Sequence, residues 1–281
     1  MIEQAWAALE GLGRHLLSPG FLLSPLYLAS TVAIAFLVWR RRGIGGRFLA
    51  WLAPREMWRH PSTWLDVKVG LFNAWLLSSS AFAALVVAPV VTHRALEFGA
   101  DAFGLAPAAG TSVLGGLATA AILFLVQDFC RFLNHYLHHK APALWPFHAV
   151  HHSAEVLTPI TFFRAHPVYY AFQRLLMSGL VGLAQAGALL LLVGRVEFWT
   201  IYATTLAFQS YMFIGGHLRH SHVDLSYGRA LEHVLISPVQ HQVHHSSDPK
   251  HFDRNFGEVF AIWDWMFGTL YIPERGERLV F

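Results

Sequence analysis

The stretch that decides the fold is Asn134–Ser153, NHYLHHKAPALWPFHAVHHS, which holds six histidines in twenty residues. It contains the spacing His-x-x-His-His twice, and the same spacing recurs at His241–His245 in the sequence HQVHH. Residues three and four apart lie on one face of a helix, so each triplet can direct several imidazole rings at one point. Because neutral imidazole is the commonest metal ligand in proteins, the triplets predict metal sites built from histidine.

The number of histidines predicts more than one metal ion. The two later triplets and the i,i+4 pair His135 and His139 already supply eight imidazoles, whereas a zinc site uses three or four protein ligands. Two ions that share eight to ten nitrogens fit better, with further donors from the stretch His217–His222. The predicted ligands are His135, His139, His148, His151, His152, His220, His222, His241, His244 and His245.

A second set of residues is expected to act as additional ligands or to orient the ligand rings. An acidic side chain next to a ligand can accept the imidazole N–H and fix the tautomer, although a solvated interfacial charge or a loop-forming role explains these residues equally well. His138 and His166 are expected in supporting or structural roles rather than as ligands. The set comprises His217, His138, His166, Asp128, Glu155, Asp253 and Asn255.

The composition is that of a membrane protein. Of 281 residues, 55% are hydrophobic and 13% are charged, and the mean hydropathy is +0.43, whereas a soluble domain carries about 25% charged residues. The single cysteine, Cys130, excludes an internal disulfide, a cysteine-ligated zinc finger and an iron–sulfur centre within one chain. The small net charge of +3 indicates membrane topology rather than nucleic-acid binding.

The apolar runs predict an all-α, polytopic helical bundle of about four or five spans with a helical, histidine-rich cytosolic cap, all in one domain over residues 1–281. Residues 1–20 read as an amphipathic interfacial helix, and residues 92–107 as a loop after the second span. The spans are predicted near 21–39, 69–91, 108–129, 175–193 and 198–215, and the metal cap at 131–174 and 216–272.

The basic residues predict which side of the membrane the histidines face. Arg40–Arg42 and Arg47 follow the first span, and such clusters stay in the cytoplasm. If so, the third span delivers His135 to the cytoplasmic side, and the hairpin of the last two spans returns His217–His245 to that same side. All the clustered histidines therefore share one compartment, and the protein is expected to be a multi-pass protein of a bacterial inner membrane.

The ligand type narrows the choice of metal. Imidazole suits zinc, copper, iron and nickel, and soft thiolate ligands are absent. A pair of iron ions that activates O2 would suit an apolar substrate delivered from the bilayer, since unactivated C–H bonds need such an oxidant. Zinc competes for the same nitrogens and can replace iron during purification.

These motifs resemble the fatty acid hydroxylase/sterol desaturase superfamily of membrane di-iron oxygenases. The resemblance covers roughly residues 125–272, and one departure is that His166-Pro167 is followed by Val168-Tyr169 rather than by an acidic residue. It implies two irons, O2-dependent hydroxylation or desaturation of a lipid, and an external electron donor that is ferredoxin-like or cytochrome b5-like with a reductase. The matching stretches are His135–His139, His148–Ser153, Arg164–Pro167, His220–Val223, His241–Ser246, Asp253–Gly257 and Ile262–Tyr271.

Other classes of function make different predictions. A metal transporter would place ionisable groups inside its spans, and these spans are nearly free of them. A zinc hydrolase or zinc-stabilised scaffold would need neither O2 nor a reductant, and a hydrolase usually needs a carboxylate base close to the metal. The sequence shows no glycine-rich phosphate loop after a strand, so we expect the chain to bind neither NAD(P)H nor FAD.

Overall fold

A computed structural model of the protein describes residues 25–281 except 275 and 278. The predicted interfacial helix at 1–20 and the first four residues of the predicted span at 21–39 lie outside the described residues. Within the described part, the regular structure is helical, with two isolated β-bridges and no β-strand. The prediction of an all-α helical bundle is confirmed for this part of the chain.

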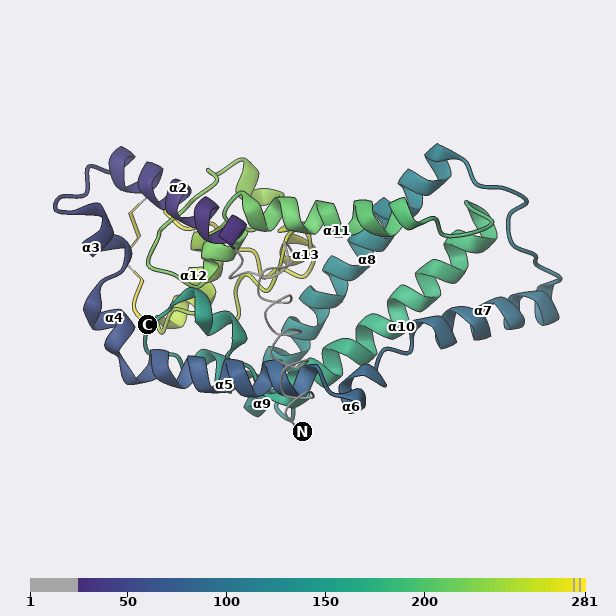
Figure 1. Ribbon diagram of the computed structural model, residues 1–281, viewed down its shortest axis with the longest axis horizontal. Helices are drawn as coiled ribbons and strands as arrows, with labels where there is room; N and C mark the ends of the chain where they lie inside the picture. The colour runs from purple at the N-terminus through teal and green to yellow at the C-terminus, as the bar shows by residue number, and fades with distance from the viewer. Residues whose placement is uncertain (1–24, 275, 278) are drawn as a thin grey trace, which may run out of the picture.

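Among the described residues, three stretches are long and apolar enough to cross a membrane: Ser80–Phe103, Val113–Lys140 and Pro167–Leu191. The first combines α6 (Ser80–Ala83) with α7 (Ala88–Phe103), and the other two are α8 and α10. α10 packs against α7 and α8, while α11 (Phe198–Phe213) packs against α8. Figure 1 shows these helices together at one end of an elongated molecule.

The last two predicted spans correspond to α10 and α11, which are joined by a short connection at residues 192–197, and both helices pack against α8. With 16 residues, α11 is about 24 Å long at 1.5 Å per residue, which is shorter than the roughly 30 Å of a bilayer core. α2 (Pro25–Arg41), at the position of the first predicted span, has 17 described residues.

The helix breaks around residue 80 differ from the prediction. α5 (Pro61–Leu77) ends before Ser78, and the Ser79 hydroxyl accepts the Phe82 N–H at the start of α6. Pro89 then lies in the first turn of α7, where its missing N–H is tolerated. Residues 69–91 are therefore not one helix. The predicted loop at 92–107 is instead helical as far as Phe103, where Gly104 ends α7 in the left-handed conformation.

The first histidine pair lies on the longest helix. α8 starts at the Ser112 cap, whose hydroxyl accepts the Gly115 N–H, and continues unbroken to Lys140. The part of the predicted span at 108–129 that begins at Val113 and the pair His135 and His139 thus belong to one continuous helix. The two rings keep their i,i+4 relation at the end of a helix that packs against α10 and α11.

The cap at the other end consists of short helices and loops. α2, α3 (Phe48–Leu52), α4 (Arg55–Arg59) and α5 enclose it in Figure 1. Ala35 of α2 packs on Leu218 and Val223 of the cap, and α5 contacts η1. The cap elements are α9 (Trp145–His152), η1 (Pro159–Phe163), η2 (Gly216–Arg219), η3 (Leu231–His233), α12 (Pro238–His244), η4 (Pro249–His251) and α13 (Ile262–Met266).

Candidate metal centre

Nine of the ten histidines predicted as ligands come together in two groups. In each group, one ligand nitrogen per residue lies within 4.8 Å of all the others. Among the described residues, neither group includes a carboxylate or a cysteine. Group one consists of His135 and His139 on α8, His148 and His152 on α9, and His244 on α12; group two consists of His151 on α9, His220 after η2, and His241 and His245 at α12.

The adjacent histidines in the two later triplets belong to different groups. Successive residues of a helix point about 100° apart, so His151 and His152 at the end of α9 cannot face the same point. His152 joins group one and His151 joins group two, and His244 and His245 divide in the same way. On α9 and α12, the spacing His-x-x-His-His therefore allows one short helix to supply ligands to two neighbouring sites.

Both short helices are fixed where they begin. Pro146 lies in the first turn of α9. α12 starts with Pro238 and a capping box, in which the Ser237 hydroxyl accepts the Gln240 N–H and the Gln240 side chain accepts the Ser237 N–H. Such a cap satisfies N–H groups that a helix start leaves free and so fixes the start of α12, while the proline of α9 restricts the backbone of its first turn.

In group one, the Nε2 atom of His152 is the centre of the cluster. It lies 3.2 Å from Nε2 of His139, 3.2 Å from Nε2 of His148 and 3.0 Å from Nε2 of His244. A neutral imidazole has a single N–H, so hydrogen bonds cannot account for three such contacts. A cation among the rings accounts for all of them, because each Nε2 lone pair then points at the ion.

Group two repeats this arrangement around Nε2 of His220. That atom lies 3.1 Å from Nε2 of His151, 3.1 Å from Nε2 of His245 and 3.0 Å from Nε2 of His241. Two nitrogens that each lie about 2.1 Å from one ion are about 3.0 Å apart at a right angle and about 3.4 Å apart at a tetrahedral angle. The observed separations are those of neighbouring ligands of one metal ion.

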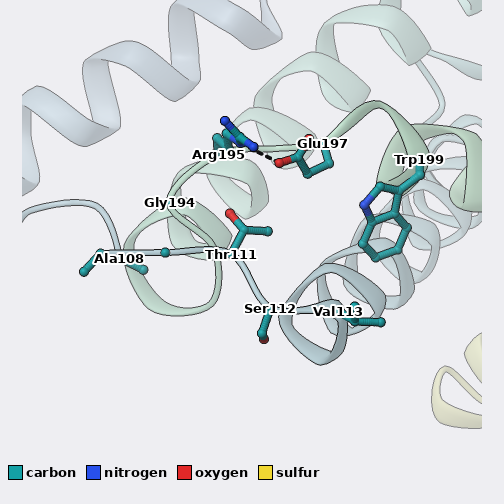
Figure 2. Close-up of a pocket in the computed structure, with 10 residues that line it drawn as sticks. Ala108, Thr111, Ser112, Val113, Gly194, Arg195, Glu197 and Trp199 are labelled. Carbon is teal, nitrogen blue, oxygen red and sulfur yellow. Dashed lines mark hydrogen bonds and ion pairs between the residues drawn. The ribbon is translucent and has the colours of Figure 1, made fainter.

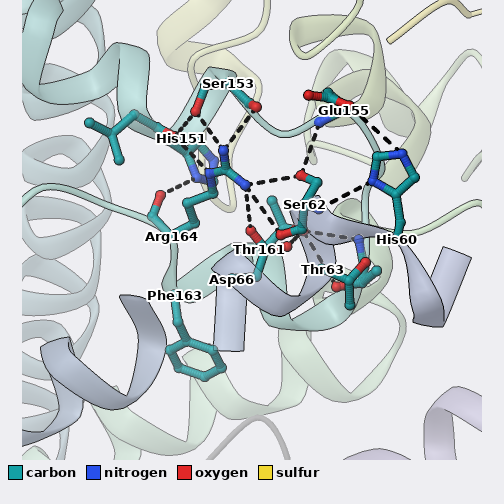
Figure 3. A network of polar contacts seen from close by, with 12 residues as sticks. His60, Ser62, Thr63, Asp66, His151, Ser153, Glu155, Thr161, Phe163 and Arg164 are labelled. Atoms are coloured by element: carbon teal, nitrogen blue, oxygen red, sulfur yellow. Dashed lines mark hydrogen bonds and ion pairs between the residues drawn. The ribbon is translucent and has the colours of Figure 1, made fainter. Parts of the chain in front are cut away.

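The opposite nitrogen of several ligand rings is bonded to a backbone carbonyl. Nδ1 of His135 lies 2.9 Å from the Phe256 carbonyl oxygen, and Nδ1 of His244 lies 2.7 Å from that of Arg254. In group two, Nδ1 of His151 lies 3.0 Å from the Arg164 carbonyl oxygen (Figure 3). A carbonyl can only accept, so these rings carry the proton on Nδ1 and present a bare Nε2 to the site.

Burial keeps the ligand rings of the cap neutral. It lowers the pKa of His151 to about 4. Burial also holds the pKa values of His148, His152, His220, His241, His244 and His245 well below 6.5, and the neighbouring rings add to the effect. Neutral imidazole is the form that binds metals, so the cap is ready to bind a cation near neutral pH.

Asp253 is the one predicted carboxylate that approaches a ligand ring. Its Oδ1 lies 3.5 Å from Nδ1 of His139, and its Oδ2 lies 2.6 Å from the Lys140 ammonium. The contact with His139, and then the Lys140 charge, hold the pKa of Asp253 well below its usual range. A carboxylate behind a ligand histidine raises the basicity of that ligand.

The two groups are immediate neighbours. The His152 ring of group one stacks on the His245 ring of group two, with centroids 4.6 Å apart and planes 25° apart. The His151 ring lies 5.3 Å from the His148 ring across the same boundary. The geometry thus fits two adjacent cations that share one wall of imidazoles.

His222 was predicted as a ligand, and the structure corrects this. It belongs to neither group. It follows η2 by three residues, and its ring packs edge-on against Trp51, with centroids 5.1 Å apart. In this loop, residues two apart point in different directions, so His220 faces the metal site while His222 faces the core beneath α3.

The three other candidate histidines have structural contacts instead. His217 lies outside both groups, with Nδ1 bonded to the Met212 carbonyl. His138 is bonded through Nδ1 to the Asn134 carbonyl and packs on Tyr169 of α10. His166 caps α10, where its Nδ1 accepts the Val168 N–H.

Asp128, Glu155 and Asn255 contact no ligand ring. Asp128 accepts the N–H groups of Val259 and Phe260 and the indole N–H of Trp263, so it ties the chain before α13 to α8. Glu155 is exposed and lies 3.7 Å from His60. Asn255 donates to the Gln240 carbonyl and accepts the Tyr271 N–H, which holds the loop after η4.

Apart from Asp253, the groups that orient the ligand rings were not predicted. The carbonyls of Phe256, Arg254 and Arg164 are backbone atoms, and a sequence carries no signal for a backbone acceptor. Asp264 was also missed. Its carboxylate accepts the N–H groups of Phe256 and Gly257, at 2.8 and 2.7 Å, and so fixes the carbonyl that holds His135. An acidic residue inside an aromatic run was the only available hint.

A hollow at the opposite end of the bundle is separate from the metal centre. It has a volume of about 530 Å³ and lies between the chain before α8 and the turn that joins α10 to α11. Figure 2 shows the Arg195–Glu197 ion pair and Trp199 at its rim. No histidine of either group lines it.

The metal centre lies within the part of the chain that matches known proteins. The sequence model of the family described as "Fatty acid hydroxylase" matches residues 120–269. This range includes all nine histidines of the two groups. No solved structure matches the chain.

Three curated relatives illustrate the similarity. The ornithine lipid hydroxylase OlsE of Rhizobium tropici is 32% identical over 54% of this chain, and alkylglycerol monooxygenases are 30% identical over 55% of it in Caenorhabditis elegans and over 56% in Homo sapiens. The matches cover 41%, 27% and 31% of these relatives, so the chain spans less than half of their length.

Proposed function

The chain belongs to the fatty acid hydroxylase family, and from this premise we propose that it is a membrane di-iron oxygenase that hydroxylates or desaturates a lipid. The substrate class is a sterol or a fatty acyl or alkyl chain, oxidised with O2 and electrons from an external donor. The names of two relatives, an ornithine lipid hydroxylase and an alkylglycerol monooxygenase, support a lipid substrate. The resemblance predicted from the histidine motifs is confirmed at the level of the family.

One observation carries the proposal: nine imidazoles converge in two neighbouring groups at the end of the apolar helix α8 and just beyond it. Five nitrogens in group one and four in group two leave positions open on a metal ion that takes six ligands. Iron is the metal in this proposal, because oxygenation needs an ion that changes its oxidation state and zinc does not. Zinc accepts the same ligands, so some of the purified protein is expected to carry it.

The residues of the chain have definable tasks in such a reaction. Bound iron supplies the activation of dioxygen. The carbonyl bonds to His135, His151 and His244 keep their Nε2 lone pairs aimed at the ions, and the buried setting excludes bulk water from the site. For hydroxylation, the substrate C–H bond and the donor each supply two electrons, so that one oxygen atom enters the lipid and the other leaves as water.

The chain is an integral membrane protein, and the proposal also assigns the cap to the cytoplasmic side of the membrane. Arg40–Arg42 and Arg47 follow α2, and the positive-inside rule favours the cytoplasm for them and for the cap. Within this proposal the membrane is a bacterial inner membrane. There an external donor, ferredoxin-like or cytochrome b5-like with its reductase, can reach the cap.

The decisive test is isotope incorporation. Iron-loaded protein in lipid vesicles would be given a chemical or protein reductant and ¹⁸O2, and the lipids would be analysed by mass spectrometry. A product with one ¹⁸O atom is expected, or a product two hydrogens lighter if the reaction is desaturation. Neither product should form without O2, or with His151→Ala or His244→Ala. A lipid product that forms without O2 and without reductant would replace the proposal with a hydrolase.

A further inference from the structure

The Arg164 side chain joins three segments of the chain behind group two. Its guanidinium donates to the Val150 carbonyl at 3.0 Å, and to the Ser153 carbonyl and hydroxyl at 2.9 and 2.7 Å. It also donates to the Ser62 hydroxyl at 3.0 Å and pairs with Asp66 at 3.0 Å (Figure 3). Arg164 is 4% exposed and Asp66 is fully buried.

These contacts grip the end of α9 from two directions. The Arg164 carbonyl accepts the Nδ1 proton of His151, while its guanidinium holds carbonyls on both sides of the pair His151 and His152. A cation at the carboxyl end of a helix is electrostatically favourable. The orientation of the His151 ring, and hence the place of its Nε2 in group two, depends on where the Arg164 side chain and backbone lie.

Asp66 determines where Arg164 lies. Its Oδ1 pairs with the guanidinium, and its Oδ2 accepts the Thr161 hydroxyl at 2.6 Å, so one carboxylate fixes both η1 and the residue that follows it. A buried guanidinium that loses its carboxylate keeps an uncompensated charge and must move or draw in water. Asp66 lies on α5, before the family match begins at residue 120.

We propose that Asp66, acting through Arg164, is a positioning residue for the metal ion of group two. It aligns His151, and it makes α5 a part of the metal centre although α5 lies outside the matched region. This inference rests on the proposed function only in that group two must bind a metal ion. It requires neither a particular lipid nor a successful reaction.

The test measures metal binding to each group in the full-length protein in detergent. Cobalt(II) would be titrated as a spectroscopic probe, and bound ions counted by elemental analysis after dialysis against a metal buffer. Asp66→Asn keeps the size of the side chain and removes its charge. In Asp66→Asn, we expect the ion of group two to bind about 10- to 100-fold more weakly, and we expect the cobalt spectrum of group two to change. Group one should keep its affinity.

Arg174→Gln is the matched control. The Arg174 guanidinium also ties α10 to the region where α5 ends, through the Phe82 carbonyl at 2.7 Å and the Leu77 carbonyl, and it touches no ligand. The Arg174→Gln variant should therefore bind both ions as tightly as the unchanged protein. Asp66→Glu should restore part of the affinity, because the charge returns.

Ser62→Ala is a milder second variant, in case Asp66→Asn does not fold. It removes one neutral acceptor of Arg164 and should weaken only the second ion, by a smaller factor. The inference is overturned if folded Asp66→Asn or Ser62→Ala binds both ions as tightly as the unchanged protein, or if Arg174→Gln loses the second ion equally. An unchanged protein that binds two ions but forms no lipid product would reject the proposed function and leave this inference standing.

Discussion

Adjacent histidines in one triplet should have separable effects on metal content. His244 contributes to group one and His245 to group two, although they are neighbours in the sequence. A structural zinc site gains about 10–16 kcal/mol from metal binding, which is about 2.5–4 kcal/mol for each of four ligands. Loss of one ligand should therefore weaken binding by about two to three orders of magnitude.

The number of remaining ligands makes the two variants unequal. His245→Ala leaves three imidazoles in group two, while His244→Ala leaves four in group one. After dialysis against a metal buffer that keeps the unchanged protein saturated, elemental analysis should show the loss of about one ion in His245→Ala. His244→Ala should retain more metal, because its site still offers four nitrogens.

His222→Ala is the control for this experiment, since His222 is only two residues from His220 in the sequence but belongs to neither group. It should keep the full metal content. The reasoning would be refuted if His222→Ala lost as much metal as His245→Ala, or if both His244→Ala and His245→Ala kept two ions.

Three further predictions concern stability. Metal-free protein should lose free energy of unfolding as the pH falls from 7.5 to 5.5: the folded-state pKa of His151, about 4, lies below the unfolded value near 6.5. The contribution of His151 to the free energy of unfolding is present above pH 6.5 and falls by about 1.3 kcal/mol between pH 7.5 and 5.5. Denaturant titrations that show no loss of unfolding free energy over this range would contradict the prediction. Asp264→Ala leaves two buried N–H groups without an acceptor and should cost about 2–6 kcal/mol, measured by thermal unfolding against Asp224→Ala, a change to a more exposed carboxylate. Chelation should lower the unfolding temperature of the unchanged protein and iron should restore it; equal temperatures with and without metal would show that the histidines bind none.

The sequence predicts the metal centre better than it predicts the helix ends. The i,i+4 pairs on α8, on α9 and at α12 follow directly from helical periodicity, and they supply six of the nine histidines that lie together. The exception, His222, lies in a loop after η2, where no periodicity relates it to His220. Likewise, the break after Leu77 depends on Ser79 and Pro89 acting within an otherwise continuous apolar run, and hydropathy alone does not register them.

The supporting contacts of the centre depend on tertiary structure. Asp66 and Arg164 are 98 residues apart, and no motif around either residue predicts that the two form an ion pair. Asp128 was expected near an imidazole because it lies near the first pair in sequence. It instead faces the segment before α13, since it lies seven residues, or about two turns, before His135.

Anomalous diffraction at the iron edge on crystals of the iron-loaded protein would show directly whether each histidine group binds an iron ion. Two peaks are expected, one within about 2.2 Å of the Nε2 atoms of group one and the other equally close to those of group two. A single peak, peaks elsewhere in the molecule, or two histidine groups that stay without metal in the presence of iron would contradict this expectation.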